Sequence, residues 1–209
     1  FSVVNVDNLR LDGNTLSATN SNGNLIIQSN GTGALQRDSG GNARGQYAVD
    51  LQKIRSVNSD VANGNYSVIA GGSSNRATNL TSVVCGGASN EANGQGSVIG
   101  GGLFNIADGT NDVIGGGYNN KAEGNYSTVC GGRYNTASAI YSTINGGLFG
   151  KATRYGEISH SSGKFANDGD AQHTTLVARC STLSGSFTVD IASPATFTRS
   201  GHSLKVGDS

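Results

Sequence analysis

The sequence predicts an all-β chain whose central part is a parallel β-solenoid, also called a β-roll, with 15-residue coils. Two observations carry this prediction: the composition and a repeat of constant length. The chain has Gly 33, Pro 1, Met 0 and Trp 0, and its charged fraction of 13% is about half the usual share for a soluble domain. Abundant Asn, Ser, Thr and Gly favour strands and tight turns over helices. Collagen is excluded, because glycine does not recur at every third position.

The repeat runs from residue 67 to residue 156 without insertion or deletion. Each copy begins with a serine, or once with Asp112, and contains a pair of glycines. A β-branched residue two places after the start recurs at Ile69, Val84, Ile99, Ile114, Val129 and Ile144. An asparagine recurs at Asn75, Asn90, Asn105, Asn120 and Asn135, and an alanine follows each of them by two places. A unit of this length suits one solenoid coil with two short strands and two turns.

Stacking such coils places equivalent residues above one another, about 4.8 Å apart. We therefore expect the β-branched residues to form an apolar column inside the solenoid and the asparagines to form an amide ladder. Gly94, Gly109 and Gly124 are expected to permit the return turn between strands. Because Ala62 keeps the phase of the repeat, a degenerate first turn is expected to begin near Gln52.

A second column of mostly apolar residues lies one place earlier in each repeat. Its members are Val68, Val83, Val98, Val113, Thr128 and Thr143. Neighbouring residues of a strand point to opposite faces, so this column must point outwards if the first one fills the interior. A stripe of valines along a fibre favours association. We expect this outer column to pack against sister chains.

The repeat pattern S-V-I-x-G-G-x-x-N-x-A-x-G resembles the head repeats of trimeric autotransporter adhesins, whose repeats are usually slightly shorter. Those heads are left-handed parallel β-rolls assembled as trimers. The resemblance implies a homotrimer, intertwined or with its chains side by side. The head of a bacterial trimeric adhesin is therefore one interpretation of this chain.

The flanking segments resemble bacteriophage tail fibres, notably those of phages that infect cyanobacteria. The segment N-L-R-L-D-G-N-T-L followed by N-G-N-L-I-I and N-G-T-G is similar to fibre shaft segments, and the segment after Gly156 is similar to the transition that follows such repeats. This resemblance implies a structural tail-fibre protein of the virion, located outside the cell, that attaches the phage to its host as a rigid trimeric spacer and receptor-binding appendage. It implies sister chains, other tail or fibre proteins, and a host-surface glycan or receptor as partners.

Three regions are expected: a β-rich shaft segment over residues 1–50, the solenoid over 51–156, and a C-terminal β region over 157–209 that leads to a tip or another domain. Because the chain begins with Phe1, we expect it to be a piece of a longer polypeptide. Short strands are predicted at Asn8–Leu11, Thr15–Ala18, Asn24–Gln28, Thr174–Arg179 and Ser186–Ile191.

A pair of carboxylates offers the sharpest enzymatic hypothesis. Asp108 and Glu123 occupy equivalent positions in adjacent coils, so stacking would place them roughly 5 Å apart. This approaches the carboxyl separation of a retaining glycosidase and supports an alternative function, a tailspike-like glycan depolymerase. The rest of that column is Thr, Asn and Ser, which indicates a solvated polar turn. We therefore predict no catalytic residues and no enzyme.

Other candidate ligands are isolated from one another. His160, His173 and His202 lack metal-ligand spacing, and no cofactor motif or phosphate loop occurs. Asp168 and Asp170 lack the further oxygens of a calcium loop and indicate a turn. We predict no metal and no cofactor.

Cys85 and Cys130 share a repeat position and lie roughly 14 Å apart along the axis, too far for a disulfide. Both are expected to be buried free thiols. Zero net charge argues against nucleic acid, and the lack of an 18-residue apolar run argues against membrane insertion. Ice binding is a weaker alternative, because Thr128 and Thr143 are the only stacked threonines on the strand.

Overall fold

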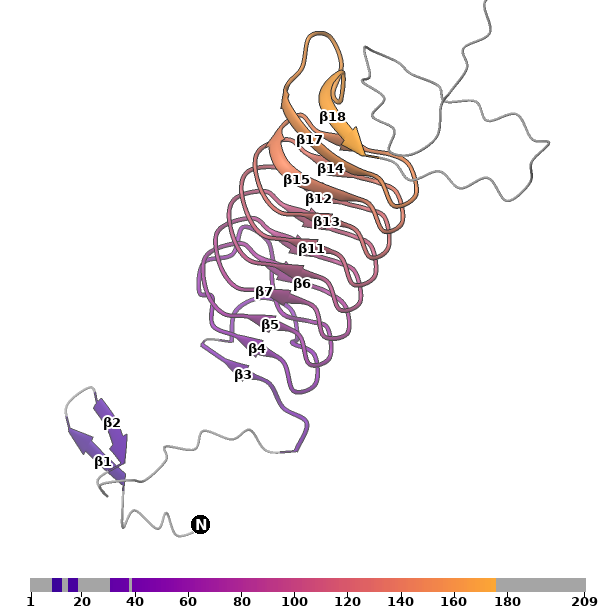
Figure 1. Ribbon diagram of the computed structural model, residues 1–209. Coiled ribbons are helices and arrows are strands. Elements are labelled where there is room, and N and C mark those ends of the chain that lie inside the picture. The colour runs from indigo at the N-terminus through magenta and orange to yellow at the C-terminus, as the bar shows by residue number, and fades with distance from the viewer. Residues whose placement is uncertain (1–8, 13–14, 19–30, 38, 176–209) are drawn as a thin grey trace, which may run out of the picture.

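The computed structural model describes residues 9–12, 15–18, 31–37 and 39–175. Within these residues every regular element is a strand, and no helix could cross a membrane. A parallel β-solenoid of about eight turns forms most of the described chain (Figure 1). The predicted all-β class and parallel solenoid are confirmed.

Two parallel ladders form the walls of the solenoid. The 10-stranded sheet contains β3 (Leu35–Gln36), β4 (Val49–Asp50), β5 (Val68–Ile69), β7 (Val83–Val84), β9 (Val98–Ile99), β11 (Val113–Ile114), β13 (Thr128–Val129), β15 (Thr143–Leu148), β17 (Ile158–Gly163) and β18 (Ala171–Thr175). The 6-stranded sheet contains β6 (Arg76–Ala77), β8 (Glu91–Ala92), β10 (Ile106–Ala107), β12 (Lys121–Ala122), β14 (Thr136–Ala137) and β16 (Lys151–Ala152). Each complete coil contributes one strand to each sheet.

The register aligns equivalent repeat positions. Val68 pairs with Val83, and Val83 pairs with Val98, in the 10-stranded sheet. In the 6-stranded sheet Ala77 pairs with Ala92. Between the two sheets, isolated parallel bridges link successive coils through Ser73, Ala88, Leu103, Tyr118, Arg133 and Leu148. Three lines of backbone hydrogen bonds therefore join each coil to the next.

The parallel ladder extends on both sides of residues 51–156. On the N-terminal side β3 pairs with β4, β4 pairs with β5, and Ala62 bridges Ala77, in the phase that the repeat gives it. On the C-terminal side β17 pairs in parallel with β15, and β18 then returns antiparallel to β17. The antiparallel return ends the stack of coils.

Near the N-terminus, β1 (Leu9–Asp12) and β2 (Thr15–Ala18) form an antiparallel hairpin. The bounds of β2 are the predicted ones, and β1 is shifted by one residue from the predicted strand Asn8–Leu11. The predicted strands Asn24–Gln28 and Ser186–Ile191 lie outside the described residues. Of Thr174–Arg179, only the first two residues are described, at the end of β18.

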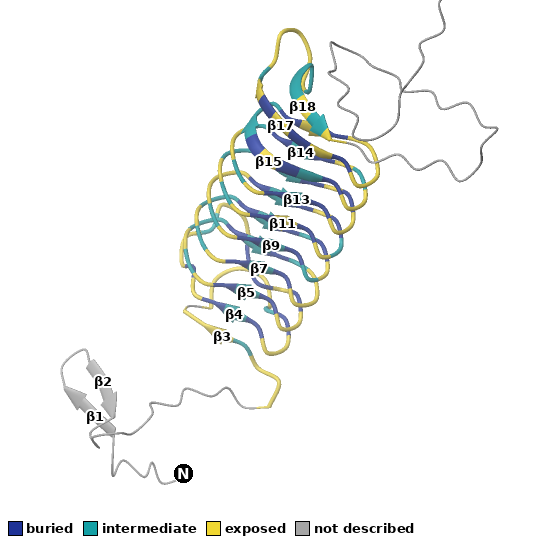
Figure 2. Ribbon diagram, viewed as in Figure 1, coloured by how far each residue is buried: buried dark blue, intermediate teal, exposed yellow. Residues whose placement is uncertain are grey.

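The interior is made of two narrow apolar columns, one from each sheet. Figure 2 shows that buried residues recur along the strands of successive coils. The 10-stranded sheet contributes Ile69, Val84, Ile99, Ile114, Val129 and Ile144, each with 0% of its surface exposed. The 6-stranded sheet contributes Ala77, Ala92, Ala107, Ala122, Ala137 and Ala152, also with 0% exposed. Because one column is alanine, the two sheets can lie close together without leaving a cavity.

The asparagine column is buried and binds the backbone at the bend between the sheets. The amide Nδ2 of Asn105 donates to the carbonyl oxygens of Gly101 at 3.0 Å and Gly117 at 3.1 Å. Its Oδ1 accepts the backbone N–H of Asn120 at 2.9 Å. Direct amide-to-amide bonds, as the ladder prediction implies, occur between Asn75, Asn90 and Asn105. The asparagines therefore satisfy buried backbone groups that the glycine bend would otherwise leave without partners.

The glycines of the return turn have a different role from the predicted one. Gly94, Gly109 and Gly124 are not among the residues with positive φ, so the turn does not need glycine for its dihedral angles. A Cβ on Gly94 would overlap the carbonyl oxygen of Gly109 in the next coil. Close stacking of coils, rather than backbone conformation, requires glycine at Gly94 and likewise at Gly124, whereas a Cβ on Gly109 would meet the carboxylate of Asp112.

Left-handed backbone instead occurs at two corners of each coil, with φ between 52 and 67°. One corner precedes the asparagine column and contains Ser74, Ser89, Phe104, Asn119, Tyr134 and Phe149. The other precedes the serine column and contains Tyr47, Tyr66, Thr81, Gly96, Asn111, Tyr126, Tyr141 and Gly156. This backbone conformation is unfavourable for most residues other than glycine and asparagine, so these corners are conformationally strained.

Polar groups replace the apolar column at both ends. Asp50 pairs with Ile69 in the ladder and accepts hydrogen bonds from Arg44 at 2.9 Å and Arg55 at 3.2 Å. At the other end Ser159 pairs with Ile144 and is buried. Glu157, two places earlier in the position of the serine column, is also buried and accepts the backbone N–H groups of Thr153 and Arg154. These residues close the ends of a core that the repeat alone would leave open.

Candidate functional site

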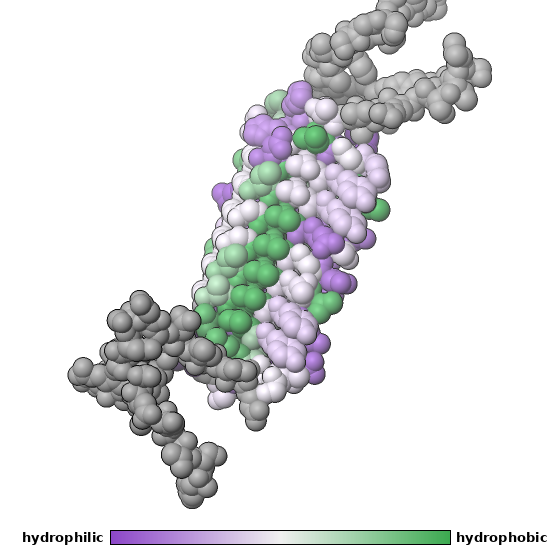
Figure 3. All heavy atoms as spheres, turned by 60° about the horizontal axis from the view of Figure 1, so that its bottom comes forward, coloured by the Kyte–Doolittle hydropathy of each residue, from purple (hydrophilic) through white to green (hydrophobic). Residues whose placement is uncertain are grey.

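The outward side of the 10-stranded sheet carries a hydrophobic stripe, which we call the apolar face. It consists of Val68, Val83, Val98, Val113, Thr128 and Thr143. Five of these side chains are half-buried in the single chain, and Val113 is 40% exposed. Figure 3 shows the stripe running along the solenoid. The column predicted to face sister chains therefore lies on the outside of the coil.

A second outward column widens the apolar face and contains no charged side chain. Its members are Ala70, Cys85, Gly100, Gly115, Cys130 and Asn145. The predicted burial of Cys85 and Cys130 is wrong, because both are exposed in the single chain. Cys85 follows the inward Val84 and therefore points outwards with Val83. Both cysteines are free thiols.

Tyrosines line one edge of the apolar face, at the left-handed corner before the serine column. Tyr47 stacks on Tyr66 with ring centroids 5.0 Å apart, and Tyr126 stacks on Tyr141 at 5.1 Å. About half of each side chain is exposed, from 47% to 54%. The rings extend the apolar surface beyond the valine column.

The outward side of the 6-stranded sheet, which we call the charged face, has the opposite character. Arg76 on β6 forms an ion pair with Glu91 on β8. Lys121 on β12 lies 3.9 Å from Glu123. Exposed pairs of this kind contribute at most about 1 kcal/mol each. The charged face is suited to contact with water.

The two carboxylates of the enzymatic hypothesis lie on this charged face. Asp108 and Glu123 are both exposed. Asn93 donates to Asp108 at 2.9 Å, which ties the carboxylate to the neighbouring polar turn. A glycosidase general acid lies in an environment of low polarity, and neither of these carboxylates is buried. Their surroundings are those of a solvated turn.

Asp112 is a buried carboxylate whose role the repeat did not reveal. It replaces the serine of the other coils and has 0% of its surface exposed. Its Oδ2 accepts the backbone N–H of Gly109, and its Oδ1 accepts that of Ser127, both at 2.8 Å. Burial raises the pKa of Asp112 above its ordinary value, and the hydrogen bonds from Ser127 and Gly109 oppose this shift. The carboxylate joins two coils and has no access to a substrate.

A cluster of rings, which the sequence reasoning also missed, lies at the other left-handed corner. We call Phe104, Tyr118, Arg133, Tyr134 and Phe149 the aromatic corner. From Phe104 through Tyr118 and Tyr134 to Phe149, successive ring centroids lie 5.9, 5.5 and 5.1 Å apart. Phe104, Tyr134 and Phe149 share one repeat position, which was a signal for this cluster in the sequence, whereas Tyr118 lies one position earlier.

Cations lie on these rings. The guanidinium of Arg133 is 5.0 Å from the centroid of Tyr118 and 4.8 Å from that of Tyr134. Lys164, in the loop between β17 and β18, has its Nζ 4.1 Å from the centroid of Phe149. Arg133 also donates to the hydroxyl of Tyr134 at 3.4 Å, which lowers the pKa of that phenol. Cation–π contacts thus accompany the ring contacts in this cluster.

The predicted histidine and aspartate candidates do not form a metal centre among the described residues, where no group of three or more His, Cys, Asp or Glu side chains could hold an ion. His160 faces His173 across β17 and β18, and His202 lies outside the described residues. Asp170 accepts backbone N–H groups from residues 165–167, which lower the pKa of its carboxyl. Asp168 pairs with Lys164 at 3.0 Å. Both aspartates stabilise a turn.

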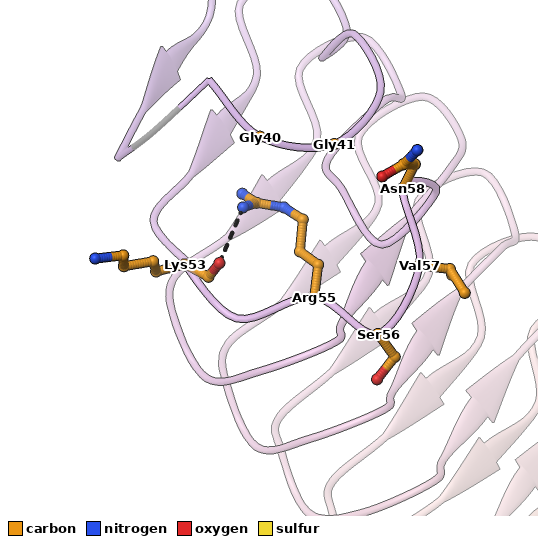
Figure 4. Close-up of a pocket in the computed structure, with 7 residues that line it drawn as sticks. All are labelled: Gly40, Gly41, Lys53, Arg55, Ser56, Val57 and Asn58. Carbon is orange, nitrogen blue, oxygen red and sulfur yellow. Dashed lines mark hydrogen bonds between the residues drawn. The ribbon is translucent and has the colours of Figure 1, made fainter.

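A shallow polar pocket opens near the N-terminal end of the solenoid (Figure 4). It is lined by Gly40, Gly41, Lys53, Arg55, Ser56, Val57 and Asn58. Arg55 donates to the carbonyl of Lys53 at 3.2 Å and to the buried Asp50. Its guanidinium therefore stabilises the end of the core, and no nucleophile with an adjacent base lines the pocket.

Comparisons with known proteins add no family assignment. The chain matches no protein-family model, and no curated protein shows significant similarity to it.

Proposed function

We propose that the chain is a structural fibre protein of a phage tail that attaches the virion to its host as a rigid homotrimer. The single observation that carries this proposal is the contrast between the uncharged apolar face and the charged face of one solenoid. Three chains would each turn the apolar face towards a common axis and leave the charged face in water. From β5 to β15 the paired residues are 15 positions apart, so the subunit contacts would repeat along this part of the fibre.

The solenoid supports the mechanical part of the proposal. Three backbone ladders join successive coils, and the buried asparagines bind the bends. A rod of this kind resists bending because any bend must break hydrogen bonds between coils. The head of a bacterial trimeric adhesin would use the same solenoid. The flanking segments, which lie largely outside the described residues, carry the preference for a phage fibre.

A glycan depolymerase is less well supported. The carboxylates of Asp108 and Glu123 are exposed on the charged face. The pocket lined by Lys53 and Arg55 lies at the N-terminal end and contains neither carboxylate. We therefore propose attachment without glycan cleavage.

The first experiment measures the mass of the chain in solution by light scattering. We expect three times the chain mass of 21.2 kDa. A stable soluble monomer would overturn the trimeric fibre. A dimer would equally contradict a threefold axis.

A second experiment tests which face is turned inwards. A spin label is attached at Cys85, with Cys130 and Cys180 replaced by serine. Because Cys85 lies on the apolar face, we expect short distances between labels on different chains. The matched control carries its label at Thr78→Cys on the charged face, also with no other cysteine, and should give longer distances. Equal distances at the two positions would reject the proposed orientation.

A further inference from the structure

The aromatic corner lies outside the two faces that the proposed fibre uses. Its residues follow the glycine pair, at the bend between the two sheets, and its rings come from four consecutive coils. Phe104 is 46% exposed, and Arg133 is exposed. The rings therefore line an outer edge of the rod.

The rings of this corner are held at positions that are unfavourable for them. Phe104, Tyr134 and Phe149 have φ of 58, 57 and 60°. Asparagine tolerates this conformation better than an aromatic residue does, and Asn119 occupies the equivalent place in the coil between Phe104 and Tyr134. The backbone conformation at these places thus costs more with a ring than with an asparagine, and contacts between the rings offset this cost. Strain of this kind is often found at functional sites.

The coil segments of the corner carry only positive charge. The segments 100–106, 115–121, 130–136 and 145–151 contain Lys121, Arg133 and Lys151 but no Asp or Glu. In the neighbouring loop, Asp168 is paired with Lys164, and Asp170 accepts backbone N–H groups. Lys121 lies beside Glu123, so Arg133 is the cation of the corner that a ligand would meet. Arg133 makes no ion pair with a carboxylate of the described residues. Its guanidinium presents a fork of N–H donors that matches a carboxylate. A ligand with carboxylates would complement this surface.

We propose that the aromatic corner binds an acidic polysaccharide, a chain of sugar units that carries carboxylate groups. The rings would pack against the apolar faces of successive sugar units, and Arg133 would bind a carboxylate. The inference deepens the proposed attachment role, because it names the class of surface ligand and the residues that hold it. A nucleic acid is a poorer fit, because strong binding of its backbone needs more cations than this corner offers.

The test uses the full chain and two soluble probes of equal length, hexagalacturonic acid and neutral cellohexaose. Binding is followed by calorimetry and by tyrosine fluorescence, which is readily observed because the chain has no tryptophan. We expect the acidic hexamer to bind more tightly than the neutral one by about tenfold or more, the effect of one charge-assisted hydrogen bond.

Three variants locate the binding. Phe149→Asn should weaken binding of the acidic hexamer by about tenfold, because it removes a ring of the cluster, and its thermal unfolding checks that the variant is folded. Arg133→Gln should remove the preference for the acidic hexamer over the neutral one. Ser74→Asn is the matched control: it changes the same left-handed position at the ring-free end of the column and should leave binding unchanged.

Several results would overturn the inference. These are no binding of either probe, equal binding of both, or the same loss of binding in Ser74→Asn as in Phe149→Asn. A change of solution mass in Phe149→Asn would also overturn it, because the corner would then be a subunit contact. A wild-type monomer that binds the acidic hexamer would reject the trimeric fibre and leave this inference standing.

Discussion

The two sheets of the solenoid are alike on the inside and opposite on the outside. Every strand from β5 to β16 turns one fully buried aliphatic side chain inwards, Ile or Val in the 10-stranded sheet and Ala in the 6-stranded sheet. Outwards, the first sheet presents valine and small uncharged residues, whereas the second presents Arg76, Glu91, Lys121 and Lys151. The fold requires only the inward residues. The outward difference therefore reports what each face contacts.

This comparison separates stability from assembly. An inward substitution should damage the chain on either sheet. An outward substitution on the apolar face should damage assembly, and one on the charged face should damage neither. The following predictions test these expectations, beginning with the largest effect.

Ile99→Ala is expected to destabilise the protein by about 3 kcal/mol, because it removes buried aliphatic volume from a column that cannot collapse around the cavity. Denaturant unfolding at fixed protein concentration measures the change, since the stability of an assembly depends on concentration. The outward control Thr78→Ala should cost less than about 0.5 kcal/mol. Similar losses in the two variants would show that the distinction between inside and outside is wrong.

Val98→Asp should break the assembly. The substitution places one carboxylate per chain on the apolar face, where like charges from sister chains would be brought together at a cost of several kcal/mol. Light scattering should then give the mass of a single chain. The control Ile106→Asp puts the same charge in the same coil on the charged face, and its mass should equal that of the wild type. If Ile106→Asp dissociates the assembly instead, the faces have been assigned the wrong way round.

Asp112→Ser should stabilise the protein more at neutral pH than at acid pH. Burial raises the pKa of Asp112 above its ordinary value of 3.8, so the folded chain favours the protonated carboxyl. Its contribution to stability is fully present below pH 3.8 and is lost as the pH rises through the raised pKa. A serine at position 112 does not ionise, so the substitution removes this dependence of stability on pH. Its hydroxyl can donate to the carbonyl oxygen of Gly109, as the hydroxyl of Ser97 donates to that of Gly94 at 2.7 Å.

The measurement is the difference in unfolding free energy between Asp112→Ser and wild type, at about pH 3 and at pH 7. Glu123→Gln serves as the control, because Glu123 is an exposed carboxylate in the same coil as Asp112. If the stability gained by Asp112→Ser is smaller at pH 7 than at about pH 3, the folded protein favours the charged carboxylate and the prediction is wrong.

The sequence predicts the interior well because the interior repeats without exception. A fixed period forces Ile69 and its equivalents onto one line, and strand alternation then places Val68 on the other side. The asparagine column follows from the same period. The return turns were also located correctly, but the reason for glycine in them was predicted wrongly. A close approach such as that of Gly94 to Gly109 depends on the distance between coils, which the sequence does not give.

The outside was harder to predict because it varies between repeats. Cys85 was predicted to be buried since it shares a side with valines, but one chain alone leaves that side open. The rings of Tyr118 and Tyr134 occupy adjacent repeat positions, so a search for conserved repeat positions passes over them. Their contact becomes visible only when the coils are stacked.

The smallest expected effect concerns the ion pair on the charged face. Arg76→Gln should change the unfolding free energy by less than about 1 kcal/mol, because both partners are solvated and about a third exposed. Added salt should reduce even this difference, since it screens exposed charges. Denaturant unfolding at low and high ionic strength measures both quantities, with Arg133→Gln as a control for the loss of a cation that has no carboxylate partner among the described residues. A large loss in Arg76→Gln, insensitive to salt, would mean that the charged face is covered by another surface and is not the side turned towards water.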